Sequence, residues 1–277
     1  MSVQSVPFLS IIGMALTLII SLGLPVFLFI RWRKKLEVRT SSLIIGAMVY
    51  YAAARVFEPF VNAAILSNVG GAVMKNMFIY AVYVGLIAVV IEEGLRYLSL
   101  KSIVRNVDED NALYFGLGFC GLEAILTAAW PQVSNILNSV LINNGMMARS
   151  LALLQEPELS ATYFAIAPLW ETASIAFLLA GIERGCIILL HICLSLVLFY
   201  YIKSGDKKYL GAALFAHFAV VAFSALMVQM DIAVVSVAVT AATSGLMAVF
   251  TLNAHKEYEA KRPMSDYAVI EQIKPVE

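Results

Sequence analysis

Long apolar runs alternate with short polar stretches along the whole chain. Seven of these runs reach or approach about 20 residues, the length that an α-helix needs to cross a bilayer. We therefore predict seven transmembrane helices, over Pro7–Ile30, Ser42–Phe57, Met77–Leu100, Ala112–Trp130, Gly185–Ile202, Tyr209–Val228 and Ile232–Asn253.

The segment Ala161–Ile182 is apolar enough to be an eighth span. If it crossed the membrane, the basic loop Lys203–Lys208 would change sides, and Glu183–Gly185 would have to form a very tight hairpin. Pro168 and Glu171 also interrupt its middle. We therefore expect a partly embedded helix here and seven spans in all, with eight as the alternative.

The composition agrees with this pattern. The chain is 61% hydrophobic and 14% charged, whereas soluble domains have about 45–50% apolar and about 25% charged residues. We expect an all-α, polytopic helical bundle, with residues 1–254 as one transmembrane domain and residues 255–277 as a short cytoplasmic tail. The 19 basic and 19 acidic residues balance, so the charge does not indicate a nucleic-acid partner.

The basic residues predict an orientation. Most of the 19 Lys and Arg residues lie after the first, third and fifth predicted spans and in the C-terminal tail. Loops rich in Lys and Arg stay in the cytoplasm. We therefore expect a multi-pass protein of a bacterial plasma membrane, with the N-terminus outside and the C-terminus inside.

Three charged residues interrupt the third span, in the sequence Glu92-Glu93-Gly-Leu-Arg96. A charge in hydrocarbon costs at least about 2.5 kcal/mol, so such residues suggest a function. On a helix Arg96 shares a face with Glu92 and nearly with Glu93, and it can neutralise one carboxylate. We interpret Glu92 as the candidate proton acceptor, with Glu93 supporting it and Arg96 orienting the pair.

Further polar residues lie at matching depth in other spans, namely Glu123, His191 and His217. Counted from the cytoplasmic anchors at the helical rise, these residues and Glu92 lie roughly 14 to 20 Å deep in a core about 30 Å thick. Each could also serve packing alone: an intramembrane histidine often hydrogen-bonds a neighbouring helix, and Glu123 could pair with Arg184. The common depth favours a shared site.

This set of residues suits hydrolysis of an amide bond, which needs a base for the water and a group that stabilises the oxyanion. Two histidines with Glu123 could bind one divalent metal such as zinc, or they could hold water without a metal. The residues leave both possibilities open. Arg55 and Glu58, three residues apart, are interpreted as a local ion pair at the outer edge of the second span.

The motifs resemble those of the YhfC-type intramembrane proteases, relatives of the CAAX prenyl endopeptidase and bacteriocin-processing enzymes and of the PrsW-type proteases. The resemblance rests on Glu92-Glu93-x-x-Arg96, Phe119-x-x-x-Glu123, His191-x-x-x-Ser195 and Ala216-His217. It implies a peptidase that cleaves a membrane-embedded or lipidated protein or peptide, with Glu92 catalytic and both histidines in the site. The wider superfamily has Asn or Asp four residues after its last histidine, where this chain has Val221.

Two other functions remain open. Intramembrane Glu and His sets also form proton relays, so a proton- or ion-coupled transporter is the main alternative, and an inactive, immunity-like scaffold is a third. The sequence Gly116-Leu-Gly118-Phe-Cys-Gly121 matches a dinucleotide-binding motif, but no strand precedes it. We interpret Gly116, Cys120 and Ala124 as a helix-packing face instead.

Overall fold

A computed structural model describes residues 3–34, 36, 39–104, 107–230 and 232–261. Within these residues every regular element is helical, and seven helices are long and apolar enough to cross a membrane. The predicted class, an all-α bundle with seven spans, is confirmed. The first span is α1 (Phe8–Arg33), and the last three are α11 (Ser174–Ser204), α12 (Lys207–Gln229) and α13 (Ala233–Lys261).

The second, third and fourth spans each contain a five-residue π-helical segment. They run as α2 (Thr40–Ala52), η1 (Ala53–Phe57) and α3 (Glu58–Lys75); α4 (Met77–Ala88), η2 (Val89–Glu93) and α5 (Gly94–Ser102); and α6 (Glu109–Ala124), η3 (Ile125–Ala129) and α7 (Trp130–Asn143). Such wide turns are rare and often mark functional sites. Here they lie beside the acidic residues Glu58, Glu92 and Glu123.

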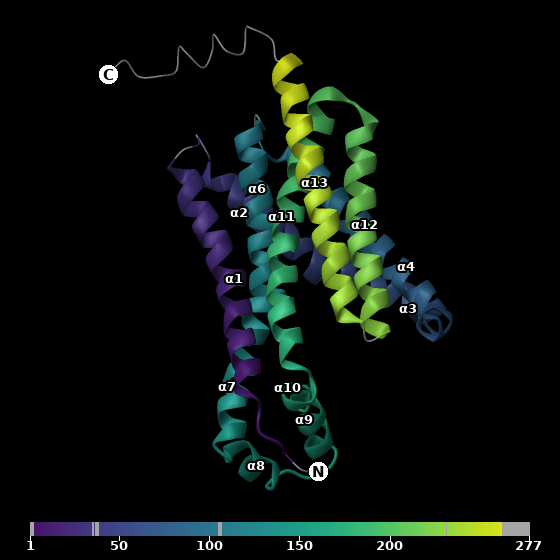
Figure 1. Cartoon of the computed structure of the whole chain (residues 1–277). Coiled ribbons are helices and arrows are strands. Elements are labelled where there is room, and N and C mark those ends of the chain that lie inside the picture. Colours follow the sequence, from purple (N-terminus) through teal and green to yellow (C-terminus); the bar gives the residue numbers. More distant parts are fainter. Residues whose placement is uncertain (1–2, 35, 37–38, 105–106, 231, 262–277) are drawn as a thin grey trace.

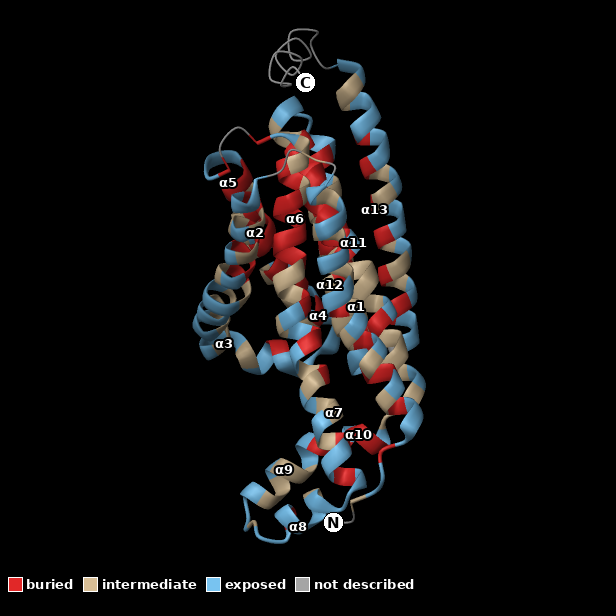
Figure 2. Ribbon diagram, turned by 90° about the vertical axis from the view of Figure 1, so that its left-hand side faces the viewer, coloured by how far each residue is buried: buried red, intermediate tan, exposed pale blue. Residues whose placement is uncertain are grey.

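Helix α11 lies at the centre of the bundle (Figure 1). It packs against α1, α6 and α13, while α2 packs on α6, and α12 packs on α4 and α13. Buried residues follow one another along α6 and α11 (Figure 2). These two helices therefore form the interior on which the other spans are arranged.

Glycines bring α2 and α6 into backbone contact. A Cβ atom on Gly118 would lie 1.9 Å from the carbonyl oxygen of Leu43, and one on Gly46 would lie 2.0 Å from that of Phe115. Gly116 faces α11, where an added Cβ would lie 3.0 Å from Ser195. Since Cys120 and Ala124 are also buried completely, the predicted packing face is confirmed.

The segment Ala161–Ile182 is not one helix. It is divided among α9 (Glu158–Ile166), α10 (Pro168–Glu171) and the first turns of α11. With α8 (Met146–Leu151) and the end of α7, α9 and α10 form a lobe beside the N-terminus (Figure 1). The predicted start of the fifth span at Gly185 is therefore wrong, because α11 begins eleven residues earlier, at Ser174.

The error has a physical cause in the two charged residues just before the predicted start of this span. Glu183 and Arg184 lie inside α11, where each has a partner on another helix. Glu183 Oε1 accepts hydrogen bonds from Ser236 and Thr240 of α13.

At the C-terminal end of the chain, α13 continues to Lys261, so the predicted tail is helical in its first part. Residues 262–277 of this tail lie outside the described residues.

Candidate active site

The polar residues predicted at one depth come together in the structure. Glu92 and Glu93 end η2 and Arg96 follows in α5, while Glu123 is on α6, His191 on α11 and His217 on α12. Except for Glu123, all are buried. Four separate spans thus contribute to one polar cluster in the apolar interior.

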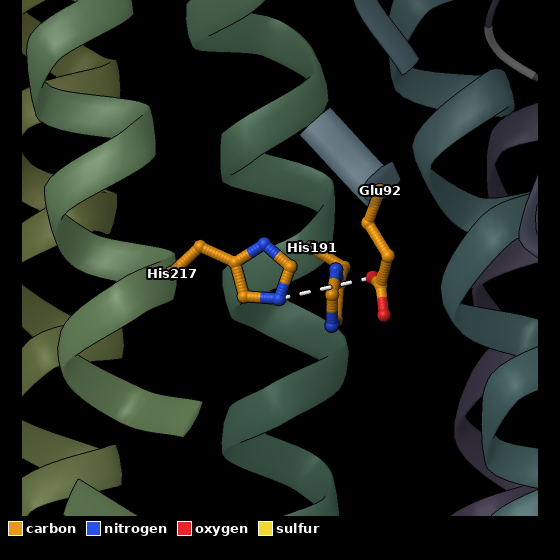
Figure 3. A group of neighbouring side chains, drawn as sticks. All are labelled: Glu92, His191 and His217. Carbon is orange, nitrogen blue, oxygen red and sulfur yellow. Dashed lines mark ion pairs between the residues drawn. The ribbon is translucent and has the colours of Figure 1, made fainter. Parts of the chain in front are cut away.

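His217 is held between the two adjacent glutamates. Its Nδ1 atom lies 2.7 Å from Glu93 Oε1, and its Nε2 atom lies 3.7 Å from Glu92 Oε2. Glu93 Oε2 lies 3.4 Å from the Nε atom of Arg96, which neutralises this carboxylate. Because a carboxylate can only accept hydrogen bonds, His217 donates its Nδ1 proton to Glu93. Its Nε2 lone pair is therefore directed toward Glu92 (Figure 3).

Arg96 connects α5 to the central helix. Its Nη1 atom donates to the His191 carbonyl oxygen at 2.8 Å and to Ser195 Oγ at 3.2 Å, and its Nη2 atom lies 2.8 Å from His191 Nδ1. The guanidinium carbon lies 3.9 Å from the centre of the Phe119 ring. Arg96 therefore contacts Glu93 as the sequence suggested, and it also fixes His191, which the sequence did not indicate.

Glu123 completes the cluster from the other side of His191. Its Oε2 atom lies 3.0 Å from His191 Nε2, and its Oε1 atom accepts a hydrogen bond from Arg184 at 2.7 Å. A guanidinium can only donate, so Arg96 occupies the lone pair of His191 Nδ1. In this arrangement the ring proton of His191 is on Nε2, the atom that faces Glu123 Oε2. The pairing of Glu123 with Arg184, which the sequence left open, is present.

Glu58 is the site residue that the sequence reasoning missed. It begins α3 directly after η1, which packs against η2, and its carboxyl group interacts electrostatically with His217 and Glu123. Its Oε1 atom is buried and has no hydrogen-bond partner. The predicted position of Arg55 and Glu58 at the outer edge of the second span is therefore wrong, because the helical span continues to Lys75. Their local pairing is not contradicted, since Arg55 interacts electrostatically with Glu58. A charge inside this longer helix was the signal that could have revealed it.

Three side chains present a set of possible metal ligands. One atom each from Glu92, His191 and His217 lies within 4.8 Å of the others (Figure 3). Two imidazole nitrogens and one carboxylate oxygen are a known catalytic zinc set. Glu92 Oε2 is buried without a hydrogen-bond partner, and a buried charge without a partner is costly. The residues present therefore fit a divalent cation.

The two histidines are prepared for such an ion to different degrees. A metal-bound histidine usually donates its other N–H to a carboxylate or carbonyl group, and His217 already does so to Glu93. For His191 to bind through Nε2, its Nδ1 must carry the proton, so the contact with Arg96 must be given up. The sequence grouped Glu123 with the histidines, whereas the group that the structure forms contains Glu92. Glu123 as a ligand stays a prediction.

Comparison with known proteins adds the family. A relative, the uncharacterized membrane protein YhfC of Bacillus subtilis (strain 168), is 28% identical over 212 residues, which cover 75% of this chain and 81% of the relative. No solved structure shows a significant match. The model of the YhfC intramembrane metalloproteases matches residues 20–243. Because this match covers well over half of the chain, the protein belongs to the YhfC intramembrane metalloprotease family.

Proposed function

We propose that this protein is an intramembrane endopeptidase that hydrolyses a peptide bond of a membrane-embedded or lipidated protein or peptide. The observation that carries the proposal is the buried group of Glu92, His191 and His217. Such groups are costly in the membrane interior and mark functional sites there. Family membership adds a metal-dependent protease as the class of activity.

In this proposal Glu92, His191 and His217 hold one divalent metal such as zinc. A catalytic metal with three protein ligands keeps a position for water, lowers its pKa to about 7 and polarises a substrate carbonyl group. Glu93 holds the His217 ring by accepting its Nδ1 proton. Arg96 balances the charge of Glu93 and ties α5 to α11.

The proton acceptor for the water is a second carboxylate. Glu92 Oε2 and Glu123 Oε2 are both buried and without a hydrogen-bond partner. With Glu92 as ligand, Glu123 takes the role of general base, while Arg184 fixes its other oxygen atom. The assignment suggested by the sequence is the reverse, with Glu92 as base and Glu123 as ligand. The grouping of Glu92 with both histidines within 4.8 Å supports Glu92 as the ligand and Glu123 as the base.

The location of the protein is also part of the proposal. With seven spans, an odd number, the N-terminus and the C-terminus lie on opposite sides of the membrane. The Lys and Arg residues near the ends of α1, α5 and α11 favour the cytoplasm for the side on which these helices end. The protein is then a bacterial plasma-membrane enzyme with its N-terminus outside.

The decisive experiment is cleavage of a library of apolar membrane peptides by purified protein with measured metal content. We expect wild type to cleave a subset, and Glu92→Gln and His217→Ala to cleave none while keeping their fold. Glu171→Gln, at an exposed residue outside the cluster, is the matched control and should behave as wild type. Absence of cleavage together with proton or ion flux that depends on Glu92 would identify a transporter instead, and absence of both would identify an inactive scaffold.

A further inference from the structure

A lateral groove of 610 Å³ runs between the third and sixth spans and reaches the polar cluster. Helices α4 and α12 touch at Gly85, where an added Cβ atom would lie 2.9 Å from Ala222 and from Phe218. The lining of the groove begins beside this contact, at Leu86 and Phe218, and includes residues of η2. The groove therefore extends from this contact toward α5 and the start of α12.

Two glycines keep the groove open. An added Cβ atom on Gly94 of α5, or on Gly211 of α12, would have no atom within 4 Å. Both residues line the groove. Most other positions on these helix faces carry bulky apolar side chains, so the glycines account for much of the free space.

The groove opens toward the lipid. Its rim includes Val90 and Phe215, which are 69% and 73% exposed although both lie on membrane-spanning helices. Its inner wall includes Glu93, the residue that accepts the Nδ1 proton of His217. The groove thus leads from the hydrocarbon phase to the candidate active site.

We propose that this groove takes up an extended, apolar segment of the substrate chain directly from the bilayer and guides it to Glu92 and His217. The inference rests on the proposed function and adds the route and the conformation of the substrate. A helix, about 10 to 12 Å across with its side chains, keeps its peptide groups bonded to one another. A bond that is to be cleaved must be freed from that arrangement.

The chemistry of the groove favours a peptide over a lipid chain. Unwound peptide N–H groups need acceptors within the membrane. Glu93 lies on the inner wall, and its Oε2 atom has Arg96 Nε at 3.4 Å but no hydrogen bond. The phenolic residues Tyr97 and Tyr201 also line the groove. A lipid acyl chain has no hydrogen-bond donor for the Glu93 carboxylate or the tyrosine hydroxyl groups. The volume of the groove lies within the range of about 300 to 1,000 Å³ that is usual for ligand sites.

The first test fills the groove without touching the cluster. In Gly94→Leu and Gly211→Leu the new side chains have room, and replacement of glycine favours the helix. We expect each variant to keep wild-type metal content and thermal stability but to cleave a membrane peptide at least about tenfold more slowly, because the substrate loses its position. Gly245→Leu on α13, also without atoms near the added Cβ, is the matched control and should cleave as wild type.

The second test observes the occupant directly and does not depend on cleavage. A benzophenone amino acid replaces Leu214 in the groove or, as control, the exposed Leu246 of α13, both in Glu92→Gln protein in lipid vesicles. The probe is a synthetic transmembrane peptide with about 20 apolar residues. On irradiation we expect a peptide adduct at position 214 and little at 246.

The outcomes separate the groove from the activity. Wild-type rates in both glycine variants, with Glu92→Gln inactive, would refute the groove and leave the proposed function intact. Adducts with lipid alone at position 214, or equal peptide adducts at both positions, would also refute it. If wild type cleaves no peptide, the proposed function fails, and a selective peptide adduct at position 214 would still support the groove as a peptide-binding site.

Discussion

His217 donates a hydrogen bond to Glu93 across the contact between α12 and η2, with Nδ1 2.7 Å from Oε1. This bond fixes both the ring orientation and the tautomer, so the Nε2 lone pair is available on the side of Glu92. Carboxylates that hold a metal-binding histidine in this way typically contribute about 10- to 100-fold in metal affinity or activity.

The first prediction follows from this bond. Glu93→Ala should weaken zinc binding about 10- to 100-fold, and Glu93→Gln, which keeps an oxygen acceptor but loses the charge, should weaken it less. Competition of the metal-free protein with a chromogenic chelator measures both. Equal zinc affinity in wild type and Glu93→Ala would show that His217 is not a ligand held by Glu93.

Metal content distinguishes the two roles that Glu92 and Glu123 could have. If Glu92 is a ligand and Glu123 the general base, Glu92→Gln loses bound metal, whereas Glu123→Gln keeps it and loses about 10²- to 10⁴-fold in turnover. Elemental analysis of the two purified variants, together with their cleavage rates, checks this. The opposite result, metal lost only in Glu123→Gln, would return Glu92 to the role of base.

Arg96 should contribute to stability as well as to the site. It is fully buried and donates to the carbonyl oxygen and ring of His191 and to Ser195. In Arg96→Lys the charge stays near Glu93, but several partners on α11 lose their donor, at about 1 to 3 kcal/mol for each unsatisfied group. We expect a clearly lower unfolding midpoint in detergent.

The control for this measurement is Lys101→Met on the same helix. Lys101 is exposed, and its amine donates to the hydroxyl group of Tyr97 at 3.0 Å. Exposed substitutions usually change stability by less than about 0.5 kcal/mol. If Arg96→Lys unfolds at the same temperature as Lys101→Met, the contacts between α5 and α11 do not stabilise the bundle.

Reporter fusions can check the orientation. We expect a fluorescent protein fused after Lys261 to fluoresce, and alkaline phosphatase inserted near Asn144, between α7 and α8, to be active. The physical reason is the basic junction of α11 and α12, with Lys203 at the end of α11 and Lys207 and Lys208 at the start of α12; such basic junctions favour the cytoplasm. If only the opposite pair of activities were found, with the first reporter dark and the second inactive, the orientation of the protein in the membrane would be the reverse of the predicted one.

The spans and the depth of the polar residues could be predicted because both depend on distance along single helices. Apolar length defines a span, and the rise per residue placed Glu92 and His217 at one level. The structure shows these two side chains in contact. Such an argument needs only the sequence near each residue.

Other features could not be predicted because they depend on packing between distant segments. Glu183 accepts hydrogen bonds from Ser236 and Thr240, 53 and 57 residues away, and without knowledge of these partners the charge at position 183 favoured a span that starts only at Gly185. The π-helical turns beside Glu58 and Glu92 have no comparable signal in the sequence. Their wider turns set which way these side chains face, so the contribution of Glu58 became visible only in three dimensions.

The contact between α2 and α6 gives a last prediction, about how closely the spans must approach. An added Cβ atom on Gly118 would lie 1.9 Å from the carbonyl oxygen of Leu43, a backbone atom that cannot move without shifting α2. On Gly121, one turn later, the nearest atom would be a Pro25 side-chain carbon at 3.6 Å, an ordinary contact. Overpacking of this kind typically costs about 1 to 3 kcal/mol or more. Gly118→Ala should therefore unfold at a lower temperature than wild type in detergent, whereas Gly121→Ala should be at least as stable as wild type because alanine favours a helix.

The same substitution should also reduce peptide cleavage. Helix α2 leads into η1 and Glu58, and Phe119 of α6 lies under Arg96, so separation of α2 and α6 in Gly118→Ala displaces residues of the candidate site. Equal stability and activity of the two variants would mean that the backbone contact at Gly118 is not needed to hold the site together.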